Sequence, residues 1–150
     1  MKKFQFALDT VLDYKQQVQE GLQNEHALLL QKVRQQQRDL EELQERYRCC
    51  NREFRQAEAE GITVAEALRF ESGLRFWQKE IQKAEQLLTQ YQKEAEEKRK
   101  QVVSARQDTS SLEKLRERKQ EDYRKAAAKG EELFIEELVA AQRAAAEKVG

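Results

Sequence analysis

Apolar residues in the first third of the chain recur at steps of mostly three, four or seven residues. Such steps align side chains along one stripe of a long helix, as in the seam of a coiled coil. Polar Lys15 and Gln36 occupy two further seam positions. The stretch from Leu22 to Val33 advances eleven residues in three steps, which predicts local unwinding of the supercoil. The predicted seam consists of Phe4, Leu8, Val11, Val18, Leu22, Leu29, Val33, Leu40, Leu43, Tyr47, Cys50 and Phe54.

The pattern stops at residues 59–63, which predicts a helix over about 4–59, a turn over about 60–63 and a second helical arm over about 64–145. Gly61 can adopt the left-handed conformation that ends a helix. Thr63 and Glu66 have the spacing of a capping box that starts the next one. Gly73 leaves open a short helix over 64–71 and a kink near the turn before the long helix.

The second arm carries a strict heptad pattern. Folding the chain back at Gly61 places Phe54 by Phe70, Tyr47 by Trp77, and Leu43 by Ile81. A parallel dimer would have to run its helix through the glycine and the cap, so we predict an intramolecular antiparallel hairpin, one domain over 1–150, that is monomeric. The heptad positions are Phe70, Trp77, Ala84, Tyr91, Lys98, Ala105, Leu112 and Lys119, interleaved with Leu74, Ile81, Leu88, Ala95, Val102, Thr109, Arg116 and Tyr123.

This pairing exhausts the first helix near residue 120 and predicts a C-terminal helical overhang over 120–150 without a partner in the chain. Large apolar residues crowd the turn end of the seam, whereas polar residues load the far end, which we expect to fray. Candidate residues for contacts with another protein lie near the turn and in the overhang. They are Leu43, Tyr47, Phe70, Trp77, Tyr123, Leu133, Phe134, Glu136, Glu137 and Leu138.

Composition agrees with long helices. The 150 residues include no proline, 37% are charged, and 28 basic residues balance 28 acidic ones. A net charge of zero argues against nucleic acid as a partner, because no global field concentrates a polyanion. The basic runs at 98–100 and 116–119 lie among acidic neighbours. A nucleic-acid clamp, which would require salt-sensitive binding, remains an alternative, and neither an export signal nor a membrane-spanning stretch is predicted.

We find no catalytic constellation, no cofactor motif and no metal-ligand spacing in the sequence. Cys49 and Cys50 are adjacent, which disfavours an internal disulfide in a helix and fits a reducing cytoplasm. His26 is the only histidine. The residues therefore predict a coiled-coil protein that is not an enzyme, with a structural spacer or scaffold as the alternative to a docking protein.

The opening Phe4-Gln-Phe6-Ala-Leu8-Asp-Thr-Val11-Leu12 resembles the start of the FliJ family, coiled-coil proteins of the bacterial flagellar type III export apparatus. The turn Glu60-Gly61-Ile62, the aromatic residues soon after it and the stretch 131–138 are similar to that family along the whole chain. The family's terminal pattern commonly has an Asp-Glu pair where this chain has Glu136-Glu137. Partner contacts at that position are therefore open.

The resemblance implies a non-enzymatic component that folds like the central stalk of rotary ATPases. It also implies the partners, namely the hexameric flagellar export ATPase, the cytoplasmic domain of the export gate and the export chaperones. The implied location is the cytoplasm, peripheral to the inner membrane at the flagellar base, without insertion into the membrane. The related stalk protein of the injectisome is the alternative within this class.

Overall fold

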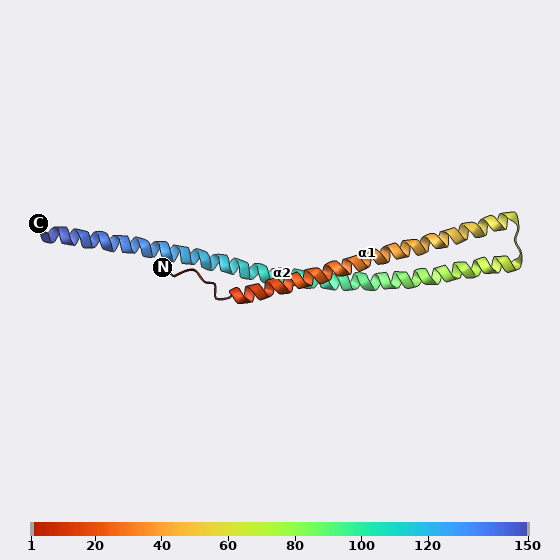
Figure 1. Ribbon diagram of the computed structural model, residues 1–150, viewed down its shortest axis with the longest axis horizontal. Coiled ribbons are helices and arrows are strands. Elements are labelled where there is room, and N and C mark those ends of the chain that lie inside the picture. The colour runs from red at the N-terminus through yellow and green to blue at the C-terminus, as the bar shows by residue number, and fades with distance from the viewer. Residues whose placement is uncertain (1, 150) are drawn as a thin grey trace. The chain divides into compact units, whose positions relative to one another are not determined.

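The computed structural model describes residues 2–149 and is built from two long helices (Figure 1). Helix α1 spans Asp9–Glu60, 52 residues, and helix α2 spans Val64–Val149, 86 residues. No strand occurs within the described residues, which confirms the all-α fold class. The predicted helix start near residue 4 is wrong, because residues 2–8 are not helical. Helix α2 continues past its predicted end near 145.

Residues 61–63 connect the helices as the sequence predicts. Gly61 has a φ of 93°, in the left-handed region that favours glycine, and its N–H donates to the Glu58 carbonyl at 3.2 Å. The Thr63 hydroxyl accepts the Glu66 N–H at 3.2 Å. One glycine thus ends α1, and one hydroxyl satisfies a backbone donor that α2 would otherwise leave unpaired.

Gly73 lies inside α2 without interrupting it, so the short helix over 64–71 and the kink that the sequence left open are both absent. A Cβ built at Gly73 would lie 3.5 Å from the Cys50 Sγ, which places the bare backbone of α2 against α1. A single glycine costs a helix only about 1 kcal/mol. Packing against α1 on this face is enough to keep the helix continuous.

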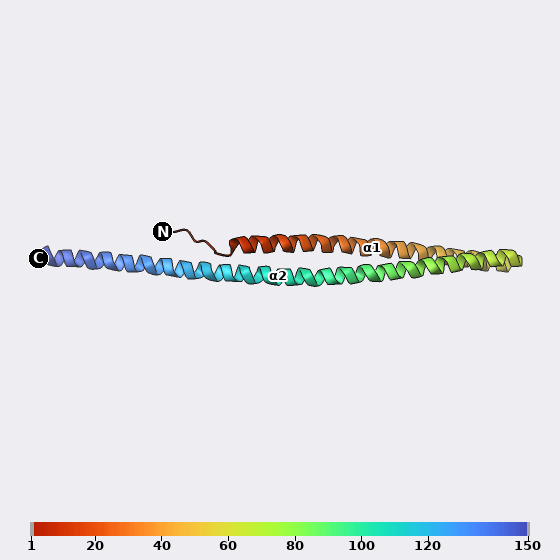
Figure 2. The same ribbon diagram turned by 90° about the horizontal axis from the view of Figure 1, so that it is seen from below.

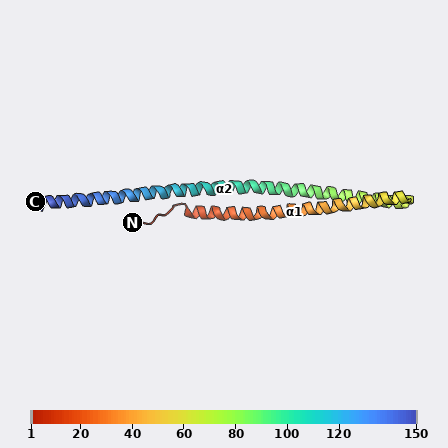
Figure 3. The ribbon, with the colours of Figure 1, turned by 90° about the horizontal axis from the view of Figure 1, so that it is seen from above.

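Contacts group the chain into two compact units. The turn unit, Glu20–Ser104, contains the connection and the two antiparallel helical segments that flank it (Figures 2 and 3). The terminal unit contains the residues up to Gln19 and those from Ala105 onward. Each unit has its own pairing between α1 and α2, and the prediction of one domain over 1–150 remains a prediction.

Side-chain contacts in the turn unit confirm the predicted hairpin register. The Phe54 and Phe70 rings are 5.2 Å apart. The Tyr47 hydroxyl accepts a 3.4 Å hydrogen bond from Gln78, next to its predicted partner Trp77. Toward the other end of the unit, Lys98 forms a 2.8 Å ion pair with Glu25. Antiparallel pairing therefore holds from the aromatic residues beside the connection to the polar seam positions.

The seam of the turn unit is narrow and its most buried residues are small. Ala84, Ala95 and Val102 are buried, and the Gln36 amide donates to the Ala84 carbonyl at 3.2 Å. The aromatic residues near the connection are only half-buried. The large apolar residues thus lie near the turn, but the most buried seam positions of this unit are the small residues farther from it.

In the terminal unit, α1 presents a different face from the one predicted. Leu12, at 2% exposed, is the most buried large side chain, whereas Leu8, Val11 and Val18 are exposed and do not form the seam. Two ion pairs of 3.6 Å, Lys15–Asp108 and Asp9–Arg116, join α1 to α2 near Leu12 and agree with this orientation. Exposed pairs of this kind contribute at most about 1 kcal/mol, so the burial of Leu12 itself is the larger contribution.

Residues 2–8, which we call the strap, lie along α2 in the terminal unit. The Phe4 and Tyr123 rings are 5.6 Å apart, and the Tyr123 hydroxyl donates to the Lys2 carbonyl. An extended segment advances about 3.3 Å per residue against 1.5 Å in a helix, so it reaches farther along its partner. The prediction that residues from Gln120 onward have no partner is therefore wrong for Tyr123.

Candidate protein-interaction surfaces

Every residue of α2 from 128 to 149, which we call the tail, is exposed. Phe134, Leu138, Ala141 and Ala145 follow each other at steps of four and three and share one face of the helix. Phe134 is 62% exposed and Leu138 48%. A helix that shows large apolar side chains to water over several turns is a candidate docking segment for another protein.

Five of the predicted contact residues, Leu133, Phe134, Glu136, Glu137 and Leu138, are brought together in this tail. Tyr123 is not among them, because it packs against the strap. The sequence prediction did not single out Ile135 and Val139, which are also exposed and form a shallow groove with Glu136 and Arg143. A helical-wheel projection of residues 131–149 would have found both, since they widen the apolar face of Phe134 and Leu138.

The other predicted contact residues lie in the turn unit. Leu43, Tyr47, Phe70 and Trp77 are half-buried at the seam. The Arg46 guanidinium lies 5.4 Å from the centre of the Trp77 ring, so one face of the indole is covered within the chain.

Phe76, which the sequence prediction missed, is 53% exposed and packs edge-on against Trp77 at 5.0 Å. Its position beside a seam aromatic is the signal that could have found it.

The basic runs are neutralised locally. Lys98 pairs with Glu25, and Arg116 with Asp9. Arg99 forms two hydrogen bonds with Glu96, and these bonds lower the pKa of the Glu96 carboxyl. Three cations of these runs, Lys98, Arg99 and Arg116, are thus paired with carboxylates. That the protein does not bind nucleic acid stays a prediction.

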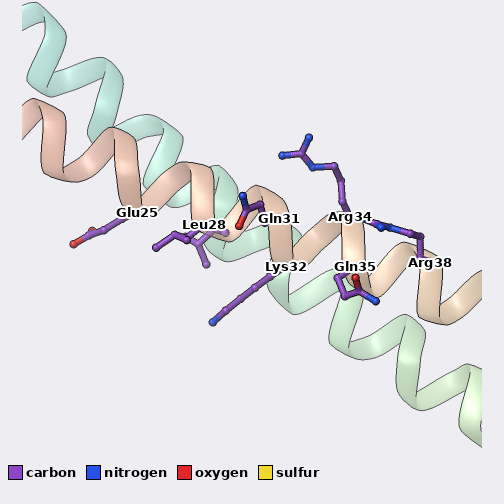
Figure 4. A pocket seen from close by; sticks show the side chains of 8 residues that line it. Glu25, Leu28, Gln31, Lys32, Arg34, Gln35 and Arg38 are labelled. Atoms are coloured by element: carbon purple, nitrogen blue, oxygen red, sulfur yellow. The ribbon is translucent and has the colours of Figure 1, made fainter.

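A shallow groove runs along α1 in the turn unit (Figure 4). Glu25, Leu28 and Lys32 point to one side of the helix, and Arg34 points to the opposite side. Leu28 is 60% exposed, which makes it the apolar centre of an otherwise polar surface. The spacing of apolar residues did not predict this groove, because Leu28 lies outside the seam pattern.

The two cysteines are not equivalent. Cys50 faces Gly73 at the seam, where burial raises the pKa of its thiol, and Cys49 is exposed beside Arg52. Across residues 2–149, no group of three or more His, Cys, Asp or Glu side chains has the arrangement of a metal site. In the same part of the chain, no helix is long and apolar enough to cross a membrane.

Comparison with known proteins adds one finding. No curated protein and no solved structure matches the chain significantly. The model of the flagellar FliJ protein family matches residues 4–148, which include most of the strap, all of α1 and all of α2 except its last residue. The chain therefore belongs to the flagellar FliJ family, whose members are coiled-coil proteins of flagellar protein export.

Proposed function

We propose that the chain is a stalk-like component of the flagellar export apparatus that docks into the ring of the export ATPase through its tail. The observation that carries this proposal is the tail itself, which displays Leu133, Phe134 and Leu138 with no covering residue. A structural spacer would need the paired helices but not this exposed apolar face. The identity of the partner comes from the family.

The mechanism that we propose uses binding alone. A single hairpin lacks the six-fold symmetry of a hexameric ring, so it contacts only some subunits at a time. Such unequal contacts stabilise some subunit interfaces over others and shift the ring toward the assembled, active arrangement. The chain contributes no catalytic group to hydrolysis in this mechanism.

The turn unit is available for a second partner. We propose that Phe76, supported from behind by Trp77, is the centre of a contact with the cytoplasmic domain of the export gate or with export chaperones. An exposed aromatic ring held by a neighbouring ring is already ordered, so binding costs it little side-chain entropy. In this proposal the protein works at the cytoplasmic face of the inner membrane at the flagellar base.

The first test is an ATPase assay with the cognate export ATPase. Full-length protein should stimulate turnover, and a truncation ending at Ala127, which keeps the Tyr123 contact with the strap, should not. Phe134→Ala combined with Leu138→Ala should also reduce stimulation. The matched control is Leu68→Ala, which removes a comparably exposed side chain from the turn unit. Equal stimulation by the full-length chain and the truncation would exclude the tail as the docking segment.

The second test concerns the turn unit. Phe76→Ala should weaken binding of the purified gate domain or chaperones, measured by titration calorimetry, and should leave ATPase stimulation unchanged. Val64→Ala, at the exposed start of α2, is the control. Loss of ATPase stimulation together with gate binding would contradict the assignment of the two partners to different units.

A further inference from the structure

One flank of α1, which includes Glu25 and Lys32 of the groove, carries an alternating charge pattern. Glu25, Lys32 and Asp39 follow each other at seven-residue intervals and therefore line one flank of the helix. Each is held by a neighbour and is still exposed. Glu25 pairs with Lys98 at 2.8 Å, Lys32 lies 5.8 Å from the centre of the Tyr91 ring, and Asp39 accepts a 3.0 Å hydrogen bond from Gln35.

The tail carries the opposite pattern at the same interval. Lys129, Glu136 and Arg143 are also seven residues apart and share one face. All three are exposed, and no ion pair within residues 2–149 involves them. Ile135 and Val139 lie beside this row of charges in the shallow groove of the tail.

We propose that the α1 groove of one copy binds the tail of a second copy, with the two helices antiparallel. In this register Glu25 meets Arg143, Lys32 meets Glu136, and Asp39 meets Lys129 of the second copy. The same register brings Leu28 against Val139 and Ala140. A parallel arrangement would satisfy the charges equally well but would place Leu28 against Glu132, so the apolar contact selects the antiparallel one.

Charge complementarity favours the tail of a second copy over a nucleic acid or an anionic membrane as the binding partner of this surface. A nucleic acid or an anionic membrane requires a surface of one sign, whereas the flank of α1 alternates negative, positive, negative. The contact joins two different surfaces, so it is heterologous and links copies head to tail. It leaves the seam between α1 and α2 intact and is therefore compatible with a monomeric hairpin at low concentration.

Sedimentation equilibrium of the full-length chain tests the proposal. The apparent mass should rise with protein concentration at low salt and fall back toward the monomer in high salt, because exposed charge pairs are screened. Lys32→Glu and Glu136→Lys should each weaken association about three- to tenfold, the range expected when one exposed attraction becomes a repulsion. Lys79→Glu, an exposed lysine of the turn unit outside the groove, is the matched control and should have no effect.

Mixing the two variants gives the decisive result. The groove of Lys32→Glu is complementary to the tail of Glu136→Lys, so an equimolar mixture should associate at least as tightly as the unaltered protein. A mixture that stays as weak as its components would overturn the proposed contact. Monomeric behaviour of the unaltered chain at every concentration, or association insensitive to both substitutions, would overturn it as well. Circular dichroism of each variant confirms that the helices are retained.

Discussion

Two parts of helix α2 differ in how much of their side chains is buried, although both carry apolar residues. Residues 64–127 pair with α1 or the strap, and the most buried among them include Ala84, Ala95, Ala105 and Thr109. The tail, residues 128–149, carries larger side chains in Phe134 and Leu138 and buries none of them. Small residues let two helices approach closely along the seam, whereas the large residues of the tail stay exposed.

The largest contrast should come from replacing one leucine in the seam between the helices, Leu12 of α1, and one leucine in the tail, Leu138 of α2, by alanine. Leu12→Ala, which empties the most buried leucine site of the pairing, should lower the free energy of unfolding by about 2–5 kcal/mol. Leu138→Ala in the tail should change it by less than about 0.5 kcal/mol. Thermal unfolding followed by circular dichroism measures both. A loss at Leu138 as large as that at Leu12 would mean that the tail is packed.

A smaller contrast is expected within the paired part. Trp77→Ala should destabilise by about 1–3 kcal/mol, below the roughly 3–5 kcal/mol of a fully buried aromatic residue, because the indole is only half-buried. Lys98→Ala should cost at most about 1 kcal/mol, since its ion pair with Glu25 is partly exposed to water. A greater loss from Lys98→Ala than from Trp77→Ala in thermal unfolding would show that the seam assignment is wrong.

Within the seam, a further small change in stability should come from Gln36→Leu. The substitution removes one hydrogen bond to the Ala84 carbonyl and adds apolar contact, so the free energy of unfolding should stay within about 1 kcal/mol of the unaltered protein. A polar residue in a seam fixes register at some cost in stability. Disulfide trapping between cysteines introduced across the seam should therefore report additional registers in Gln36→Leu, and a single register in both proteins would contradict this role.

The sequence predicted the strict heptad of α2 from Phe70 to Thr109 and the hairpin register about Gly61, because a regular seam admits few alternatives. It failed at the start of α1, where Leu8, Val11 and Val18 offered one stripe and Leu12 another. Local spacing could not choose between these stripes. Asp108 and Arg116, which are distant in the sequence, pair with Lys15 and Asp9 in the observed orientation, in which Leu12 is buried against the partner segment.

The prediction of a helix in the strap failed for a related reason. Phe4 and Phe6 are two residues apart. Such residues share one face of an extended segment but lie on different faces of a helix. Phe4 contacts Tyr123 and Phe6 is buried, contacts that no pattern within the strap itself reveals. In the candidate surfaces, the spacing of residues predicted the apolar face of the tail, and the position of Phe76 beside Trp77 was a signal in the sequence. The α1 groove emerged only once the neighbouring side chains were placed.

Helix α2 is continuous and has a covered part and an uncovered part, and we propose that the uncovered part binds a partner protein. Amide hydrogen exchange along α2 tests it most directly, because protection reports local opening. In the isolated protein, residues 128–149 should exchange orders of magnitude faster than residues 70–109, and the cognate export ATPase should slow exchange in the tail. Equal protection along the whole of α2 in the isolated protein, or a tail whose exchange the ATPase leaves unchanged, would contradict the account.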